Sequence, residues 1–169
     1  MPVTKAVLAD VPQLNVLVNS AYRGEASKQG WTTEADLLDG MRIDEEMLTS
    51  YFNDNNVIIL KNTDEDGVLN GCVYLEVRRP KLYVGMFSVS PVLQGKGIGR
   101  DLLLAAEEQA KQLDIHILSM TVISVRSELI DWYKRRGYQP TGEMLPFHPG
   151  EKFGTARQHL ELAVLEKTI

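Results

Sequence analysis

The strongest constraint on the fold of this chain is a glycine-rich run that joins two segments of opposite hydrophobic pattern. The run is Gln-Gly-Lys-Gly-Ile-Gly-Arg, residues 94–100. Residues 82–89, just before it, are apolar on both faces, which predicts a strand at the centre of a sheet. Residues 98–113, just after it, place apolar side chains at helical spacing, with charged side chains between them. The run therefore predicts a tight connection from a buried strand to a helix.

Three glycines at a helix start allow successive backbone N–H groups to converge on an anion, which the helix dipole also favours. A phosphate or pyrophosphate is the expected ligand. Lys96 and Arg100 add positive charge there, although the whole chain has a net charge of −5. The run matches neither GxxxxGK[ST] nor GxGxxG. The alternative is a glycine-rich turn that reverses the chain and binds nothing.

Hydrophobic periodicity along the rest of the chain predicts an α/β fold. Strands are expected at 4–9, 57–60, 68–78, 82–89, 115–123 and 158–166, and helices at 10–22, 33–41, 44–51, 98–113 and 127–136. In the strand at 68–78, one face carries valine and leucine side chains, and the wetter face carries Tyr74, Glu76 and Arg78. Because some consecutive strands are joined directly and others through a helix, the sheet is expected to be mixed.

Length and composition restrict the class of protein. A chain of 169 residues corresponds to one domain, 1–169, at about 150 residues per domain. Acidic residues outnumber basic ones, so the chain is not expected to have the broad basic surface that binds nucleic acid or an anionic membrane. Cys72 is the single cysteine, which excludes an intramolecular disulfide and a CxxC metal site. With no signal peptide and no apolar span of about 18 residues, a cytoplasmic protein is expected.

Two blocks of the sequence resemble the GNAT superfamily of acetyl-CoA-dependent acetyltransferases. Residues 89–103 are similar to the family's Q/R-x-x-G-x-G/A loop, and Trp-Tyr-Lys-Arg-Arg-Gly-Tyr at 132–138 is similar to its Tyr-x-x-x-Gly-Phe/Tyr ending. The resemblance covers nearly the whole chain, because the order of the expected strands and helices also matches. It implies a mixed, largely antiparallel central sheet of about six to seven strands flanked by about four helices.

The resemblance also implies where acetyl-CoA binds. Backbone groups of Phe87, Ser88 and Val89 correspond to those that contact the pantetheine arm, and the loop corresponds to the pyrophosphate site. The loop residues are Gln94, Gly95, Lys96, Gly97, Ile98, Gly99 and Arg100. Many relatives carry an asparagine seven residues before the family tyrosine, where this chain has Arg126. The contact made by that asparagine is therefore in doubt here.

Transfer of an acetyl group to an amine needs donors for the oxyanion, a proton for the leaving sulfur and a base. A strand N–H near Val89 is expected to supply the first. The resemblance places Tyr133 at the tyrosine that protonates the departing thiolate; alternatively, it is an ordinary packing aromatic. Glu76 is the expected base, through a water molecule. Glu25 and Glu34 are alternatives, and each of these carboxylates could instead be solvated.

Two less patterned segments are candidates for acceptor binding and closure. The first segment, 21–34, combines aromatic, charged and glycine residues, and its substrate-binding candidates are Tyr22, Arg23, Glu25, Trp31 and Glu34. The second, 140–155, could form a lid, with His148 either exposed or a proton carrier. The basic residues 134–136 are a solvated helix end or approach a cofactor phosphate, and Cys72 is expected to be a small buried side chain.

The sequence as a whole favours an N-acetyltransferase that moves the acetyl group of acetyl-CoA to a primary amine by direct attack, through a tetrahedral intermediate and without a metal. The alternative is a catalytically silent acyl-CoA-binding or sensing module. A remoter alternative is another enzyme that binds a nucleotide phosphate. The acceptor stays open among a polyamine, an amino acid, an antibiotic, and a protein N-terminus or lysine. The sequence also leaves a homodimer open.

Overall fold

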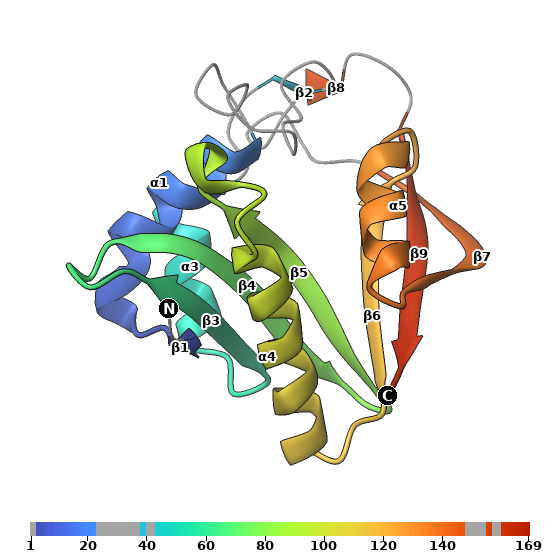
Figure 1. Cartoon of the computed structure of the whole chain (residues 1–169), viewed down its shortest axis with the longest axis horizontal. Coiled ribbons are helices and arrows are strands. Elements are labelled where there is room, and N and C mark those ends of the chain that lie inside the picture. The colour runs from blue at the N-terminus through green and yellow to red at the C-terminus, as the bar shows by residue number, and fades with distance from the viewer. Residues whose placement is uncertain (1–2, 23–37, 40–42, 148–154, 157–159) are drawn as a thin grey trace.

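A seven-stranded sheet forms the centre of the protein, whose computed structural model describes residues 3–22, 38–39, 43–147, 155–156 and 160–169 (Figure 1). The strand order is β1-β3-β4-β5-β6-β9-β7. The strands are β1 (Val3–Lys5), β3 (Val57–Thr63), β4 (Leu69–Arg78), β5 (Lys81–Val89), β6 (Ile117–Ile123), β7 (Gln139–Pro146) and β9 (Glu161–Thr168). Among the described strands of this sheet, only β5 and β6 pair in parallel. The mixed, largely antiparallel sheet predicted from the sequence is confirmed, with β5 at its centre.

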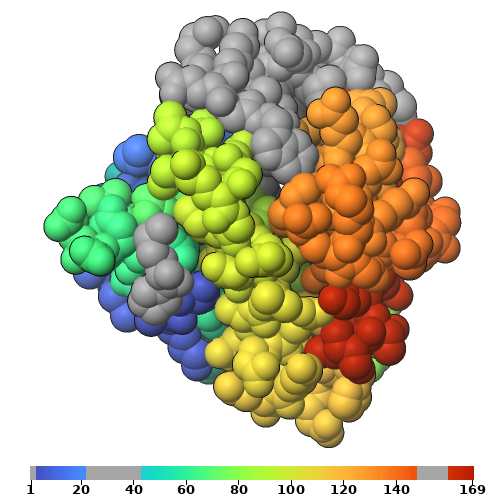
Figure 2. All heavy atoms as spheres, viewed as in Figure 1, coloured from blue at the N-terminus to red at the C-terminus, as the bar shows by residue number. Residues whose placement is uncertain are grey.

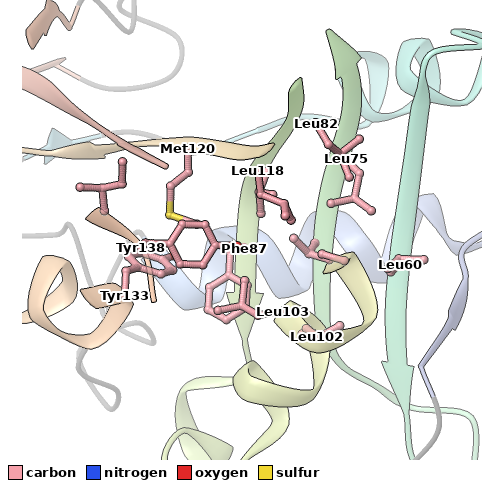
Figure 3. Close-up of a cluster of buried hydrophobic side chains, with 14 of the residues drawn as sticks. Leu60, Leu75, Leu82, Phe87, Leu102, Leu103, Leu118, Met120, Tyr133 and Tyr138 are labelled. Carbon is pink, nitrogen blue, oxygen red and sulfur yellow. The ribbon is translucent and has the colours of Figure 1, made fainter. Parts of the chain in front are cut away.

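Helices cover both faces of this sheet. They are α1 (Val11–Tyr22), α3 (Glu45–Phe52), α4 (Ile98–Gln112) and α5 (Ser127–Arg135). Buried side chains of α1 and α3 form one core with one face of β3, β4 and β5. Those of α4 and α5 form a second core on the opposite face, together with residues of β5 and β6 (Figure 3). No helix among the described residues is long and apolar enough to span a membrane.

Side chains fix several of these elements locally. Asp44 caps α3, because its carboxylate accepts the N–H of Met47 at 2.8 Å. The turn between β3 and β4 is held by Asp64, whose carboxylate accepts the N–H groups of Asp66 and Val68, each at 2.9 Å. The strand alternation is confirmed, because Val73 and Leu75 lie in the core with α4 whereas Tyr74 lies in the core with α1. The face predicted to be wetter is not wet at Tyr74, because α1 and α3 cover it and leave that side chain buried.

The strand β4 passes very close to the start of α4. A Cβ atom added to Gly71 would lie 2.9 Å from Leu102 Cδ1 and 3.0 Å from Ile98 Cγ2. Both contacts are shorter than side chains normally allow, so glycine is the residue that permits this approach. The first turn of α4 therefore rests directly on the backbone of β4.

Three elements differ from the sequence prediction. The first strand, predicted over 4–9, ends at Lys5, and the Asp10 carboxylate that follows it accepts the N–H of Val7 at 2.8 Å and pairs with Lys61 at 2.9 Å. Leu38, predicted in a helix, lies in β2 (Leu38–Asp39), which pairs with β8 (Thr155–Ala156). Residues 140–146, predicted as part of a lid, lie in β7, an edge strand paired with β9.

The central strands β5 and β6 stay paired over a short stretch only. The pairs run from Lys81 with Ile117 to Tyr83 with Ser119. Beyond them the two strands diverge toward the end of β5 and the start of α5 (Figure 1). Among the described strands, none pairs with the β6-facing edge of β5 after Tyr83. Pairing between β5 and β6 therefore covers only the first residues of β5.

Candidate functional site

A pocket lies at the N-terminus of α4, between the end of β5 and the helix α5. Its lining residues come from all three elements and from the glycine-rich loop: Phe87, Val89, Leu93, Gln94, Gly95, Gly97, Ile98, Gly99, Arg100, Trp132 and Arg136. In the space-filling view, the loop before α4 and the helix α5 lie next to each other on one face of the molecule (Figure 2). The glycine-rich run predicted to bind an anion therefore lines a pocket.

The loop owes its shape to two glycines in the left-handed region and one side-chain hydrogen bond. Gly95 has φ +87°, and Gly97, with φ +86°, is the residue that precedes α4. Gln94 Nε2 donates to the carbonyl oxygen of Val89 at 3.1 Å, which ties the loop to the end of β5. The first backbone N–H groups of a helix have no acceptor within the helix. In α4 those N–H groups belong to loop residues that line the pocket.

An aromatic wall closes one side of the pocket. The rings of Phe87 and Trp132 lie with their centroids 5.6 Å apart. A Cβ atom added to Gly99 would lie 2.9 Å from Phe87 Cζ and 3.3 Å from Trp132 Cη2. The helix start therefore packs against this wall, and a larger residue at position 99 would displace it.

The charge of the pocket is opposite to that of the chain. Two arginines, Arg100 and Arg136, line it, and none of its described lining residues carries a carboxylate. Burial, followed by the charges of Arg135 and Arg100, holds the pKa of Arg136 below its usual range. Positive charge beside a helix N-terminus suits an anionic ligand such as a phosphate ester.

Most of the predicted cofactor residues meet in this pocket, with two exceptions. Ser88 is buried, and its hydroxyl donates to Met86 O at 3.1 Å. Lys96 is exposed and does not line the pocket. Sequence reasoning did not assign Leu93 and Trp132 to the pocket, and it named Arg136 only within a basic run. The spacing of Trp132 and Arg136, four residues apart in a predicted helix, is the signal that would have placed them on one face.

Tyr133 lies beside the pocket, within the core (Figure 3). Its side chain is 4% exposed, and its ring centroid lies 6.0 Å from that of Phe87 and 5.3 Å from that of Trp132. A third aromatic ring, that of Tyr138, lies 6.0 Å away. Tyr133 is therefore fixed against the aromatic wall, and its role as an acid stays a prediction.

Glu76 lies at the other end of β4, on the face covered by α1 and α3. Its carboxylate accepts the hydroxyl of Tyr74 and Nε of Arg78, each at 2.5 Å. The hydrogen bond from Arg78, reinforced by that from Tyr74, holds the pKa of Glu76 below its usual range. Glu76 pairs with Tyr83, whereas Gly71 pairs with the pocket residue Val89, roughly 17 Å away along the strand. The structure thus does not bring Glu76 into the pocket.

The predicted acceptor residues lie almost entirely outside the described residues. Tyr22 ends α1. The positions of Arg23, Glu25, Trp31, Glu34 and His148 are outside the described ranges. Cys72 is fully buried, as the sequence predicts.

Comparisons with known proteins agree with this geometry. A mycothiol acetyltransferase of Propionibacterium freudenreichii subsp. shermanii is 27% identical over 146 residues, which are 84% of this chain and 44% of that protein. The chain thus spans less than half the length of this curated relative.

Solved structures share the fold at low sequence identity. A ribosomal-protein-alanine N-acetyltransferase of Brucella melitensis superposes with a TM-score of 0.74 at 20% identity, over 100% of both chains. The yncA protein of Salmonella typhimurium, solved with its cofactor acetyl-CoA, superposes with a TM-score of 0.73 at 20% identity, over 99% of this chain and 93% of that one. The family description "Acetyltransferase (GNAT) domain" matches residues 25–148, which is most of the chain. The protein therefore belongs to the GNAT acetyltransferase domain family.

Proposed function

We propose that this protein is an N-acetyltransferase that moves the acetyl group of acetyl-CoA to a primary amine. One observation carries the proposal: helix-start N–H groups and two arginines line a pocket beside the stretch of β5 that follows its pairing with β6. Coenzyme A has a diphosphate for the helix start and an amide-containing arm for a strand edge. The chemistry of the residues present therefore fits this cofactor.

The residues that would hold acetyl-CoA are those around the pocket. The backbone N–H groups from Gly95 to Arg100 would bind the diphosphate, and backbone groups of residues 87–89 would bind the pantetheine arm. When bound, acetyl-CoA supplies an acetyl thioester whose carbonyl carbon is open to attack by an amine. The aromatic wall of Phe87 and Trp132 restricts the access of water on its side of the pocket.

Three groups of the chain are proposed to stabilise the oxyanion, to protonate the leaving sulfur and to accept the proton of the amine. A backbone N–H near Val89 donates to the oxyanion, and the phenol of Tyr133 donates a proton to the leaving sulfur. Glu76, which lies outside the pocket, would accept the proton of the amine through a chain of water molecules. The hydrogen bonds that keep Glu76 ionised also weaken it as a base, so its contribution is expected to be smaller than that of Tyr133.

The test is release of CoA thiol from acetyl-CoA in the presence of a diverse panel of amines, with the product identified by mass spectrometry. The panel should include a peptide with an N-terminal alanine, because the Brucella melitensis neighbour is named for that acceptor. Release that depends on one amine, with an acetylated product, supports the proposal. Tight binding of acetyl-CoA without release for any amine favours a sensing module instead. Failure to bind acetyl-CoA contradicts both.

A further inference from the structure

The guanidinium of Arg136 is held rigidly at the edge of the pocket. Its Cζ atom lies 3.8 Å from the centroid of the Trp132 ring, which is a stacked cation–π geometry. Its Nη1 donates to the carbonyl oxygen of Trp132 at 3.1 Å. Stacking and hydrogen bond together restrict the rotation of the side chain, so little entropy remains to be lost when a ligand binds.

The end of α5 that carries Arg136 is also fixed to the rest of the molecule. Lys167 on β9 donates from Nζ to the carbonyl oxygen of Arg136 at 2.9 Å. The same ammonium pairs with Glu107 on α4. Lys167 thus links the C-terminal end of α5 to α4. The two pocket arginines, Arg136 after α5 and Arg100 on α4, therefore lie on two helices whose relative position is fixed.

The charge of Arg136 has no counter-charge within the described residues. No salt bridge there involves it, and the charged neighbours that act on it, Arg100 and Arg135, have the same sign. Its buried Nε has no hydrogen-bond acceptor among them. A partly buried cation without a partner is costly. An anion in the adjoining pocket would relieve that cost.

We infer that Arg136 binds a phosphate group of the acyl-CoA and gives this protein its preference for the nucleotide form over shorter acyl thioesters. The inference rests on the proposed function. The phosphate is either in the diphosphate or in the ribose 3′-phosphate of the cofactor, which share the chemistry that a guanidinium recognises. Arg136 is thus a specificity residue that acts on the part of the cofactor remote from the thioester.

The experiment measures dissociation constants by calorimetry for acetyl-CoA, acetyl-dephospho-CoA and S-acetylpantetheine. The variants are Arg136→Gln, Arg136→Lys and the matched control Arg135→Gln, which removes the same charge from the neighbouring exposed residue outside the pocket. Arg136→Gln should weaken acetyl-CoA binding by about 10- to 100-fold. Arg136→Lys should retain part of the affinity. S-acetylpantetheine, which has neither the diphosphate nor the 3′-phosphate, should bind Arg136→Gln and the wild type equally.

The three ligands separate the possible results. Loss confined to acetyl-CoA assigns the contact to the 3′-phosphate, and equal loss for acetyl-dephospho-CoA assigns it to the diphosphate; both support the inference. Equal effects of Arg136→Gln and Arg135→Gln would overturn it, and so would an equal loss for S-acetylpantetheine, which would indicate a packing role at Trp132. Failure of the proposed function would show in the wild type, which would then bind no acetyl-CoA.

Discussion

Gly95 and Gly67 offer a matched pair for testing the loop. Both have positive φ, +87° and +79°, and an added Cβ would meet nothing within 4 Å at either position. Alanine should therefore destabilise the protein by a similar amount at both, about 1–2 kcal/mol, because of backbone strain alone. Only Gly95→Ala should also weaken acetyl-CoA binding, since residue 95 lines the pocket. Urea unfolding and calorimetric titration measure the two effects. Equal affinity in both variants would mean that the loop backbone does not bind the cofactor.

Tyr133 and Tyr138 allow loss of a hydroxyl to be compared at two neighbouring buried rings. Tyr133→Phe should lower kcat about 100-fold and leave the affinity for acetyl-CoA nearly unchanged, because an acid acts on the leaving group during transfer. Tyr138→Phe should leave kcat unchanged. Its hydroxyl is buried with no hydrogen-bond partner among the described residues, so its loss should raise the free energy of unfolding by about 1 kcal/mol.

Steady-state kinetics with saturating acetyl-CoA and chemical denaturation of both tyrosine variants provide these values. If Tyr133→Phe turns over as fast as the wild type, Tyr133 is a packing residue and another group protonates the sulfur. A similar loss of turnover in both variants would point to disturbed packing of the aromatic cluster rather than to acid catalysis.

At the scale of the element, the outer end of β4 carries a hydrogen-bonded trio, Tyr74, Glu76 and Arg78. Arg78 and Tyr74 lower the pKa of Glu76 in the folded protein, so the ionised carboxylate stabilises the fold above the ordinary glutamate pKa of about 4.3. That stabilisation is lost as the pH falls through the lower folded-state pKa. The same carboxylate is the proposed base, so the proposal predicts that activity also depends on its ionisation.

The expected outcome is a pH-dependent difference in unfolding free energy between the wild type and Glu76→Gln. The wild type should be the more stable above pH ~5, and its advantage should shrink as the pH is lowered toward ~3. Urea unfolding at several pH values measures this. Glu143→Gln, at an exposed position of β7, is the control and should change stability by less than about 0.5 kcal/mol. A difference that is constant with pH would show that the trio does not perturb Glu76.

Elements with a strong hydrophobic period were predictable, and exposed ones were not. The buried positions of α1 and α4 and the alternation of β4 follow directly from residue spacing. The strand β7 contains Pro140 and Pro146 and is exposed at nearly every position, so it shows no period; its pairing with β9 depends on an edge that only the assembled sheet provides. Leu38 was assigned to a helix for a similar reason, since its strand consists of two residues.

The site was predictable where it is local in sequence. The loop at 94–100 could be recognised because the glycines and the flanking strand and helix are adjacent in the chain. The participation of Trp132 and Arg136 depends on how α5 packs against β5 and α4, which spacing alone does not determine. The isolation of Glu76 from the pocket depends on strand register. Tertiary packing therefore decides which predicted residues meet.

At the scale of the whole molecule, the net charge is −5, but two arginines, Arg100 and Arg136, line the same pocket. Ligand binding there should stabilise the entire fold, because the pocket joins β5, α4 and α5. Acetyl-CoA at about 100 times its Kd should add about 2.7 kcal/mol to the free energy of unfolding and raise Tm accordingly. ATP and NAD should cause much smaller shifts at the same concentration. Thermal unfolding with each ligand measures this, and an equal shift for all three would contradict selectivity for the acyl-CoA.

The close approach of Gly71 to the first turn of α4 also affects the pocket. Ile98, which lines the pocket, and Leu102, one turn further along α4, both rest on the backbone of Gly71, more than twenty positions earlier in the chain. One extra methyl group at that position would displace the start of α4, and with it the backbone amides that line the pocket. The geometry of the pocket thus depends partly on Gly71, which is not among the residues that line it.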